Sequence, residues 1–259
     1  SALTANTTGG NNTAIGNQSL LSNTTASFNV GVGHHALENN TTGASNTAVG
    51  SDCLRANTTA DNNTAVGKAA LTANTTGTRN VSVGSTALDA NTTANDNTAI
   101  GFESLTTNTT GLQNTAVGSK TLGNNETGSN NTALGFFALN ANTTGSNNVA
   151  VGKSALDANT TASNNTAVGQ AALGANSTGA NNTVVGTIAL DANTTGTNNV
   201  AIGYDALGSN TTANASVAVG QSALAANTTG EGNVAVGANV LDASTTASFN
   251  SNIISSCTI

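Results

Sequence analysis

The sequence predicts an all-β protein, a single-chain parallel β-solenoid (β-roll) with 17 residues per coil and about 15 coils. First, Asn, three small or β-branched residues and Gly recur at this constant interval without an insertion or deletion. Second, hydrophobic residues make up 37% of the chain but aromatic residues only 2%, which suits a thin core. Third, the apolar spacing does not follow the 3.6-residue period of a helix. The repeats begin at Asn12, Asn29, Asn46, Asn63, Asn80, Asn97, Asn114, Asn131, Asn148, Asn165, Asn182, Asn199, Ser216, Asn233 and Asn250.

We number each repeat from its Asn, as positions 1 to 17. Position 9 is Leu in every full repeat and position 4 is Val, Ile or Leu, so these two columns are expected to form the core. Position 2 alternates between Thr and Val and is expected to share the inward strand face with position 4. Gly at position 5 predicts a positive φ or a tight bend. Positions 6 and 7 vary freely, which predicts exposure.

Residues 1–249 are predicted to form the solenoid, and residues 250–259 a degenerate apolar C-terminal rung that contacts another subunit. The chain begins within a repeat and no polar cap is evident, so both edges are expected to stack head to tail on other copies. The near-constant Ala at position 3 is expected to offer a smooth face for lateral packing. The candidate subunit contacts are Leu3, Phe28, Phe249, Ile253, Ile254, Cys257 and Ile259.

Position 12 is a column of Asn, each followed two residues later by Thr, and this is the acceptor pattern for N-glycosylation. The other interpretation is an Asn ladder that satisfies backbone groups at a turn. Glu126 at position 13 indicates that this position faces water, so positions 12 and 14 are expected to point inward, which favours the ladder. Glycosylation of this Asn column, which would coat one edge of the solenoid with glycans, remains the alternative. The column contains Asn6, Asn23, Asn40, Asn57, Asn74, Asn91, Asn108, Asn125, Asn142, Asn159, Asn176, Asn193, Asn210 and Asn227.

Few residues suggest chemistry. His34 and His35 lie at positions 6 and 7 without a repeated Cys, Asp or Glu at ligand spacing, so a solvated pair is favoured over a metal site. No arrangement typical of catalysis is evident, and we expect neither an enzyme nor a cofactor. Apolar residues at the same two positions are a candidate exposed adhesive stripe, with scattered surface residues as the alternative. They are Phe102, Phe136, Phe137, Ile188 and Tyr204.

Composition limits the partners. Five Lys and Arg in a chain of net charge −7 give no basic stripe for nucleic acid, and no apolar run approaches the length of a membrane span. We expect a secreted or cell-surface protein whose leader has been removed. Cys53 and Cys257 both lie at position 8, twelve repeats apart, so they cannot pair within one rod. Buried free thiols are favoured over an intermolecular disulfide.

The segment Asn-Thr-Ala-Val-Gly-x-x-Ala-Leu, and especially Ser216–Leu224, resembles the head repeat of YadA-like trimeric autotransporter adhesins; similar repeats occur in phage tail-fibre proteins. The resemblance covers essentially the whole chain. It implies a left-handed parallel β-roll, surface display and trimers. The repeat is longer than the usual one of that family, because it adds the Asn-Thr-Thr-Gly corner, and the chain has no heptad stalk.

We therefore expect an extracellular structural protein, a glycosylated subunit of a self-assembling head-to-tail filament or surface fibre, whose main partner is itself. The alternative is an adhesin head or tail-fibre segment that binds a receptor or glycan through positions 6 and 7. The third hypothesis is an ice-binding protein with regular Thr columns. Its usual array needs two outward Thr separated by one inward residue, whereas the Thr-Thr pair is expected to send only one outward.

Overall fold

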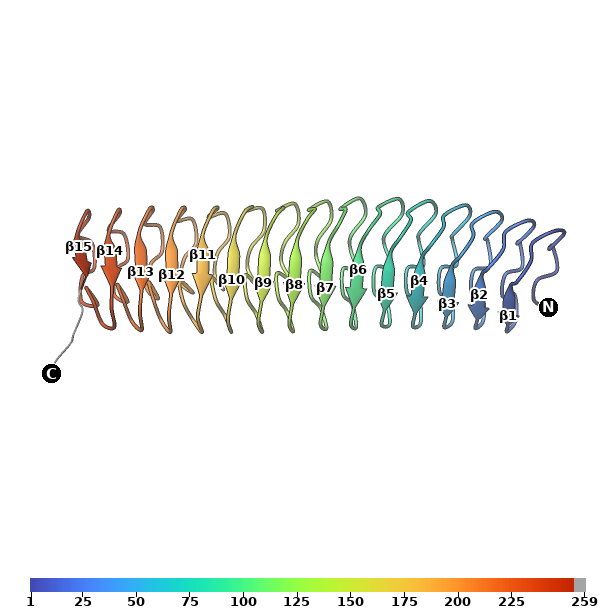
Figure 1. Cartoon of the computed structure of the whole chain (residues 1–259), viewed down its shortest axis with the longest axis horizontal. Helices are drawn as coiled ribbons and strands as arrows, with labels where there is room; N and C mark the ends of the chain where they lie inside the picture. The colour runs from blue at the N-terminus through green and yellow to red at the C-terminus, as the bar shows by residue number, and fades with distance from the viewer. Residues whose placement is uncertain (254–259) are drawn as a thin grey trace. The chain divides into compact units, whose positions relative to one another are not determined.

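The computed structural model describes residues 1–253. The chain divides into two compact units, Ser1–Asn131 and Thr132–Ile259. Each unit is a stack of coils in which every coil contributes one short strand and returns through two turns to the start of the next (Figure 1). The predicted β-solenoid is confirmed. No helix among the described residues is long and apolar enough to cross a bilayer.

Every strand has three residues and occupies positions 2 to 4 of its repeat. The first unit contains β1 (Thr13–Ile15), β2 (Val30–Val32), β3 (Thr47–Val49), β4 (Thr64–Val66), β5 (Val81–Val83), β6 (Thr98–Ile100) and β7 (Thr115–Val117). The second contains β8 (Thr132–Leu134), β9 (Val149–Val151), β10 (Thr166–Val168), β11 (Thr183–Val185), β12 (Val200–Ile202), β13 (Val217–Val219), β14 (Val234–Val236) and β15 (Ser251–Ile253).

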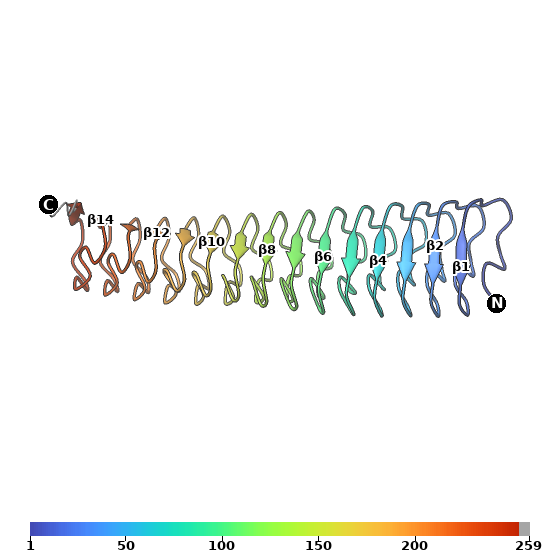
Figure 2. The same ribbon diagram turned by 60° about the horizontal axis from the view of Figure 1, so that its bottom comes forward.

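Within each unit, consecutive strands pair in parallel and without a register shift. Thr13 lies opposite Val30 in the first unit, and Thr132 lies opposite Val149 in the second. One coil therefore takes up one full repeat, as the sequence predicts. Figure 2 shows the same side-by-side order of the strands from a second direction. Equivalent side chains of successive coils consequently stack in columns.

The core differs from the predicted one in its strand residues. Leu at position 9 is buried, as predicted, but positions 2 and 4 point outward and position 3 points inward. Ala48 and Ala65 are fully buried, whereas Val66 is 36% exposed. The inward Asn at position 1 sets the alternation of the strand, so position 3 follows it to the interior.

The interior at position 3 lies against Leu and holds Ala, Gly or Ser in most coils, with the buried Val184 as the exception. A Cβ on Gly31 would lie 3.3 Å from Cγ of Leu20, in the preceding coil. The expectation that the Ala column forms a lateral packing surface is therefore wrong, because these residues line the core. Position 8 is also buried, and its polar members donate to the position 3 carbonyl of the next coil, as Ser19 Oγ does to Gly31 O at 2.8 Å.

Each coil turns through residues with positive φ. Gly at position 5 has φ between +122° and +145° in the described coils, which confirms the predicted bend. Positions 7, 9 and 17 adopt the left-handed helical region although, apart from Gly232, they are not Gly, as Gln18 (59°), Leu20 (50°) and Phe28 (63°) show. This conformation is unfavourable for a residue with a Cβ, so the contacts between coils must hold it in place.

Candidate functional site

Two buried columns of Asn run through the coils of each unit, at positions 1 and 12. At position 12, Asn40 Nδ2 donates to Oδ1 of Asn23 in the preceding coil (3.1 Å) and to the backbone O of Gly43 (2.9 Å). At position 1, the backbone N–H of Asn46 donates to Oδ1 of Asn29 (2.9 Å). Because buried amides must be paired, each Asn depends on its neighbours in the adjacent coils.

The two Asn columns meet at one backbone carbonyl in each coil. Asn29 Nδ2 and Asn40 Nδ2 both donate to Gly43 O, at 2.8 and 2.9 Å. Asn63 and Asn74 make the same pair of bonds to Gly77 O. The carbonyl at position 15 thus links the Asn at position 1, at the start of the strand, to the Asn at position 12, in the turn.

The structure shows the Asn ladder at the candidate glycosylation sites. Position 12 is buried from Asn23 to Asn227, and Asn6 in the first coil is half-buried. Both hydrogens of the Asn40 amide are used in the ladder, so a sugar on that nitrogen would displace a buried bond. The expectation that position 14 points inward is wrong: Thr25 and Thr42 are exposed, because they lie in a turn where strand alternation does not apply.

The position 12 ladder ends at Asn227, because Ser244 takes the next place. Asn227 Oδ1 is the one buried side-chain oxygen or nitrogen without a partner among the described residues. Replacing Ser244 by Asn is expected to supply a donor and to stabilise the coil containing β14 by about 1 kcal/mol. Hydrogen exchange of β14 measures the effect. The matched control, Ser209→Asn at an exposed position, should change nothing; equal protection in both variants would contradict the ladder as the cause.

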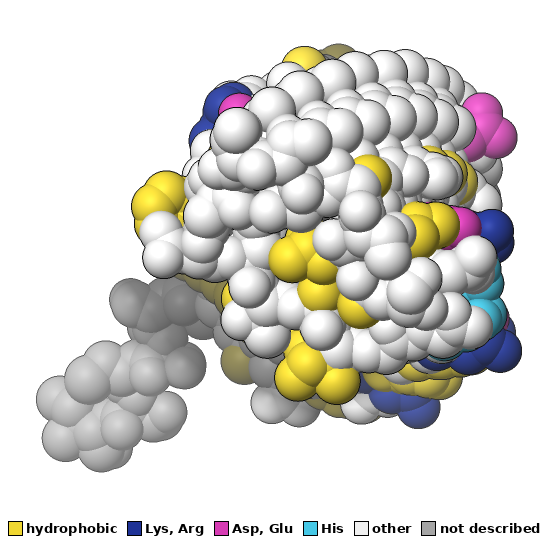
Figure 3. Space-filling model, turned by 90° about the vertical axis from the view of Figure 1, so that its right-hand side faces the viewer, with side chains coloured by type: hydrophobic (Ala, Val, Ile, Leu, Met, Phe, Trp, Pro, Cys, Tyr) yellow, Lys and Arg dark blue, Asp and Glu magenta, His cyan; other side chains and the backbone are white. Residues whose placement is uncertain are grey.

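The outward side chains at positions 2 and 4 form a surface that we call the sheet face. It carries Thr or Val at position 2 and Val, Ile or Leu at position 4, from β1 to β7 in one unit and from β8 to β14 in the other. None of these residues is charged. Large apolar side chains are exposed here, including Val49 (37%), Ile100 (39%) and Leu134 (47%). Figure 3 shows Lys, Arg, Asp, Glu and His side chains at scattered places on the face turned to the viewer.

No protein-family model, curated protein or solved structure matches the chain. The resemblance to YadA-like head repeats stays a prediction.

One cluster of charged groups lies at a corner of the second and third coils. Glu38 Oε2 accepts a hydrogen bond from Nε of Arg55 and lies 2.7 Å from Nδ1 of His35. Arg55 Nη1 also lies 3.5 Å from Oδ1 of Asp52. Burial raises the pKa of Glu38, but the bonds from Arg55 and His35 outweigh it and hold that pKa below its usual value. Glu38 is thus ionised at neutral pH.

Stacking of the coils brings Asp52 next to the two histidines, a neighbour that the sequence analysis missed. One ligand atom from each of His34, His35 and Asp52 lies within 4.8 Å of the others. Asp52 lies one repeat after His35, so it occupies the same position of the next coil. The repeat length itself could have revealed this neighbour. In a solenoid, residues one repeat apart in the sequence lie side by side, so they can ligate the same ion.

The candidate adhesive residues do not form a continuous stripe. Phe102, Phe136 and Tyr204 are exposed, whereas Phe137 and Ile188 are half-buried. Phe136 and Phe137 pack edge to face with ring centroids 4.4 Å apart. Polar residues occupy position 6 in the coils between, including Lys153 and Gln170.

Of the candidate subunit contacts, Phe28 (62%), Phe249 (83%) and Ile253 (69%) are exposed, and Leu3 is half-buried. Ile254, Cys257 and Ile259 lie outside the described residues.

Cys53 is a buried thiol whose Sγ donates to the backbone O of Ala65 at 3.1 Å. Burial raises the pKa of this thiol to about 12, so it stays protonated at neutral pH. Its environment is that of an inert structural residue.

Proposed function

We propose that the chain is a structural protein, a segment of an extracellular fibre whose copies associate side by side through the sheet face. The observation that carries the proposal is the uncharged, β-branched outward surface of the strands in both units. Contiguous exposed apolar surface of this kind marks interaction sites. The extracellular location follows from the resemblance to surface-displayed adhesins. No catalytic activity forms part of the proposal.

The repeat length favours a second copy as the occupant of the sheet face. Side chains on this face recur once per coil, and only a partner with the same spacing between coils can match them along the whole stack. A second copy has that spacing. The absence of charge on the face also removes the like-charge repulsion that a chain of net charge −7 would otherwise meet on self-association.

Head-to-tail stacking is the second mode of self-association. Each coil binds the next through the same backbone and Asn ladders, as in the bonds from Val30 N to Asn46 O and from Gly33 N to Ile15 O. We propose that the same groups join the outer coils of two copies. A contact of this kind does not close on itself and generates a filament.

The proposal is tested by measuring the mass of the particles in solution. We expect native mass spectrometry to give a multiple of 25.0 kDa, with a dimer and a trimer as the supporting outcomes. Val49→Lys combined with Val83→Lys puts two charges on the sheet face and should weaken association at least about 100-fold, because buried charges are costly. The matched control places Lys at two exposed turn residues, as Thr42→Lys and Thr76→Lys, and should associate as the parent does.

Two outcomes would overturn side-by-side association: a monomeric parent chain across the accessible concentrations, or undiminished association of the sheet-face variant. Electron microscopy of the same samples reports on the head-to-tail mode, since it distinguishes long fibres of uniform width from dispersed particles. Circular dichroism of the variants establishes that the coils remain folded.

Ice binding is the second candidate because of one observation on the strands. Positions 2 and 4 point outward and are separated by an inward position 3, as Thr47, Ala48 and Val49 show. The sheet face thus has this spacing, with Val, Ile or Leu at position 4 in place of a second outward Thr. Thermal hysteresis of the parent chain that is lost in the sheet-face Lys variant would favour this function over the fibre.

A further inference from the structure

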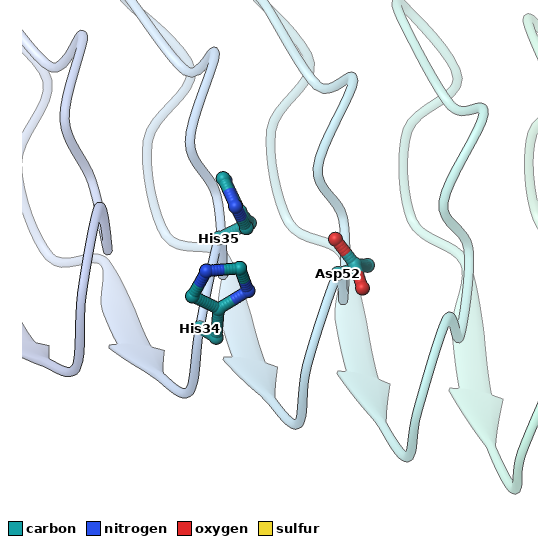
Figure 4. Close-up of side chains that lie close together, drawn as sticks. All are labelled: His34, His35 and Asp52. Atoms are coloured by element: carbon teal, nitrogen blue, oxygen red, sulfur yellow. The ribbon is translucent and has the colours of Figure 1, made fainter.

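We propose that His34, His35 and Asp52 form a binding site for a divalent transition-metal ion, with Zn²⁺ as its expected occupant. Both histidines of the chain belong to this cluster. His34 and His35 lie on the coil that follows β2, and Asp52 lies at the corresponding turn after β3 (Figure 4). The backbone fixes this proximity, because Asp52 N donates to His34 O at 2.9 Å.

The hydrogen bond of His35 leaves a ring nitrogen available for a metal. Glu38 Oε2 lies 2.7 Å from Nδ1 of His35, and an ionised carboxylate only accepts hydrogen bonds. Nδ1 of neutral His35 must therefore carry the hydrogen, and Nε2 has the free lone pair. A carboxylate behind a ligating imidazole is the usual support of a metal-binding histidine, because it fixes the tautomer and the ring orientation. Arg55 holds Glu38 in turn, at 2.7 Å.

His34 is the exposed member of the cluster. Its ring is exposed and packs edge to face on His35, with centroids 3.7 Å apart, and it has no hydrogen-bond partner among the described residues. Metal ligation needs ligand atoms about 2.0–2.2 Å from the ion, closer together than the 4.8 Å within which these atoms lie. Metal binding therefore requires the side chains of the cluster to move closer together, and the exposed His34 side chain has the most room to do so.

The ligand types and the charge select the ion. Two imidazoles and one carboxylate suit Zn²⁺, Ni²⁺ and Cu²⁺, whereas Mg²⁺ and Ca²⁺ prefer oxygen ligands alone. Asp52 and Glu38 are negative and Arg55 is positive, so the cluster has one net negative charge when both histidines are neutral. Three protein ligands leave coordination positions open toward solvent, where water completes the shell.

The test is isothermal titration of the full chain with ZnCl₂ near neutral pH. We expect one ion per chain, little or no heat with MgCl₂, and an absorption band in the visible region when CoCl₂ is used as the probe. Substitutions His34→Ala and His35→Ala should each weaken binding at least about 10-fold, and Asp52→Asn should do the same. Asp205→Asn is the matched control, because Asp205 occupies position 7 of a coil without histidine.

The histidine variants are expected to fold, since positions 6 and 7 hold Lys68 and Ala69 in another coil. Binding that persists in a Cys53→Ala and Cys257→Ser double variant supports the cluster, and loss of binding there would assign the ion to a thiol and overturn the proposal. The proposal is also overturned when the parent binds no Zn²⁺, or when His34→Ala and His35→Ala bind as tightly as the parent.

Discussion

Replacement of Asn74 by Asp is expected to destabilise the first unit by about 3–5 kcal/mol at pH 7. Asn74 is fully buried, and its Nδ2 donates to Asn57 Oδ1 (3.0 Å) and Gly77 O (2.9 Å). Its Oδ1 accepts from Asn91 Nδ2 at 3.0 Å. Asp keeps the acceptor but removes both donors, so a buried carboxylate would face two oxygen atoms.

The loss of unfolding free energy in the Asn74→Asp variant should depend on pH. Burial and the facing oxygens favour the neutral carboxyl, so its pKa in the folded variant is raised above the unfolded value of about 3.9. The variant is least destabilised below that value, and the loss grows as the pH rises from there through the folded pKa. Urea unfolding at pH 4 and pH 7 measures the difference.

Thr76→Asp is the control for this prediction, because Thr76 is exposed two residues away on the same turn. We expect a change within about 0.5 kcal/mol at both pH values. Equal losses in the two variants, or a loss at Asn74 that does not change with pH, would show that the ladder contributes little to stability.

Replacement of Gly84 by Ala is expected to cost about 2–4 kcal/mol and to expose β5 and β6 to hydrogen exchange. Gly84 has φ +137°, and an added Cβ would clash with the backbone O of Gly101 in the next coil. Both the conformation and the contact exclude a side chain. Because each coil contacts only its neighbours, the loss of protection should be greatest in these two strands.

Gly10→Ala is the matched control, since a Cβ there meets nothing within 4 Å. It should leave the urea midpoint and the exchange pattern unchanged. A Gly84 variant as stable as the Gly10 variant would mean that neighbouring coils can move apart at this bend.

The sequence predicted the features that depend on repetition alone. A strict repeat interval predicts the coil, Leu at position 9 predicts the core, and invariant Gly at position 5 predicts a bend that only Gly adopts. The direction of the strand residues was not predicted, because larger apolar residues are expected inside. The interior holds Leu and two Asn columns, so position 3 is Ala in most coils, with Val184 as the largest buried side chain there, and Val at position 4 lies outside.

The cluster of His34, His35 and Asp52 and the division into compact units were not predicted, for different reasons. Asp52 comes close to His34 only because the chain completes a full coil between them. Sequence motifs for metal sites look for ligands a few residues apart, so they do not detect this pair. The division between Asn131 and Thr132 has no counterpart in the repeat, which continues across it without a change in length.

The registered Asn columns restrict how such a gene can change in length. Deleting one residue would move every later side chain by one place, turning Val toward the interior and Ala toward solvent, and breaking both amide columns at once. Adding or removing one whole repeat would restore each column after a single junction. The protein can therefore lengthen or shorten by duplication or loss of whole repeats. An insertion or deletion of any other length would disrupt the stacking of every column at that point.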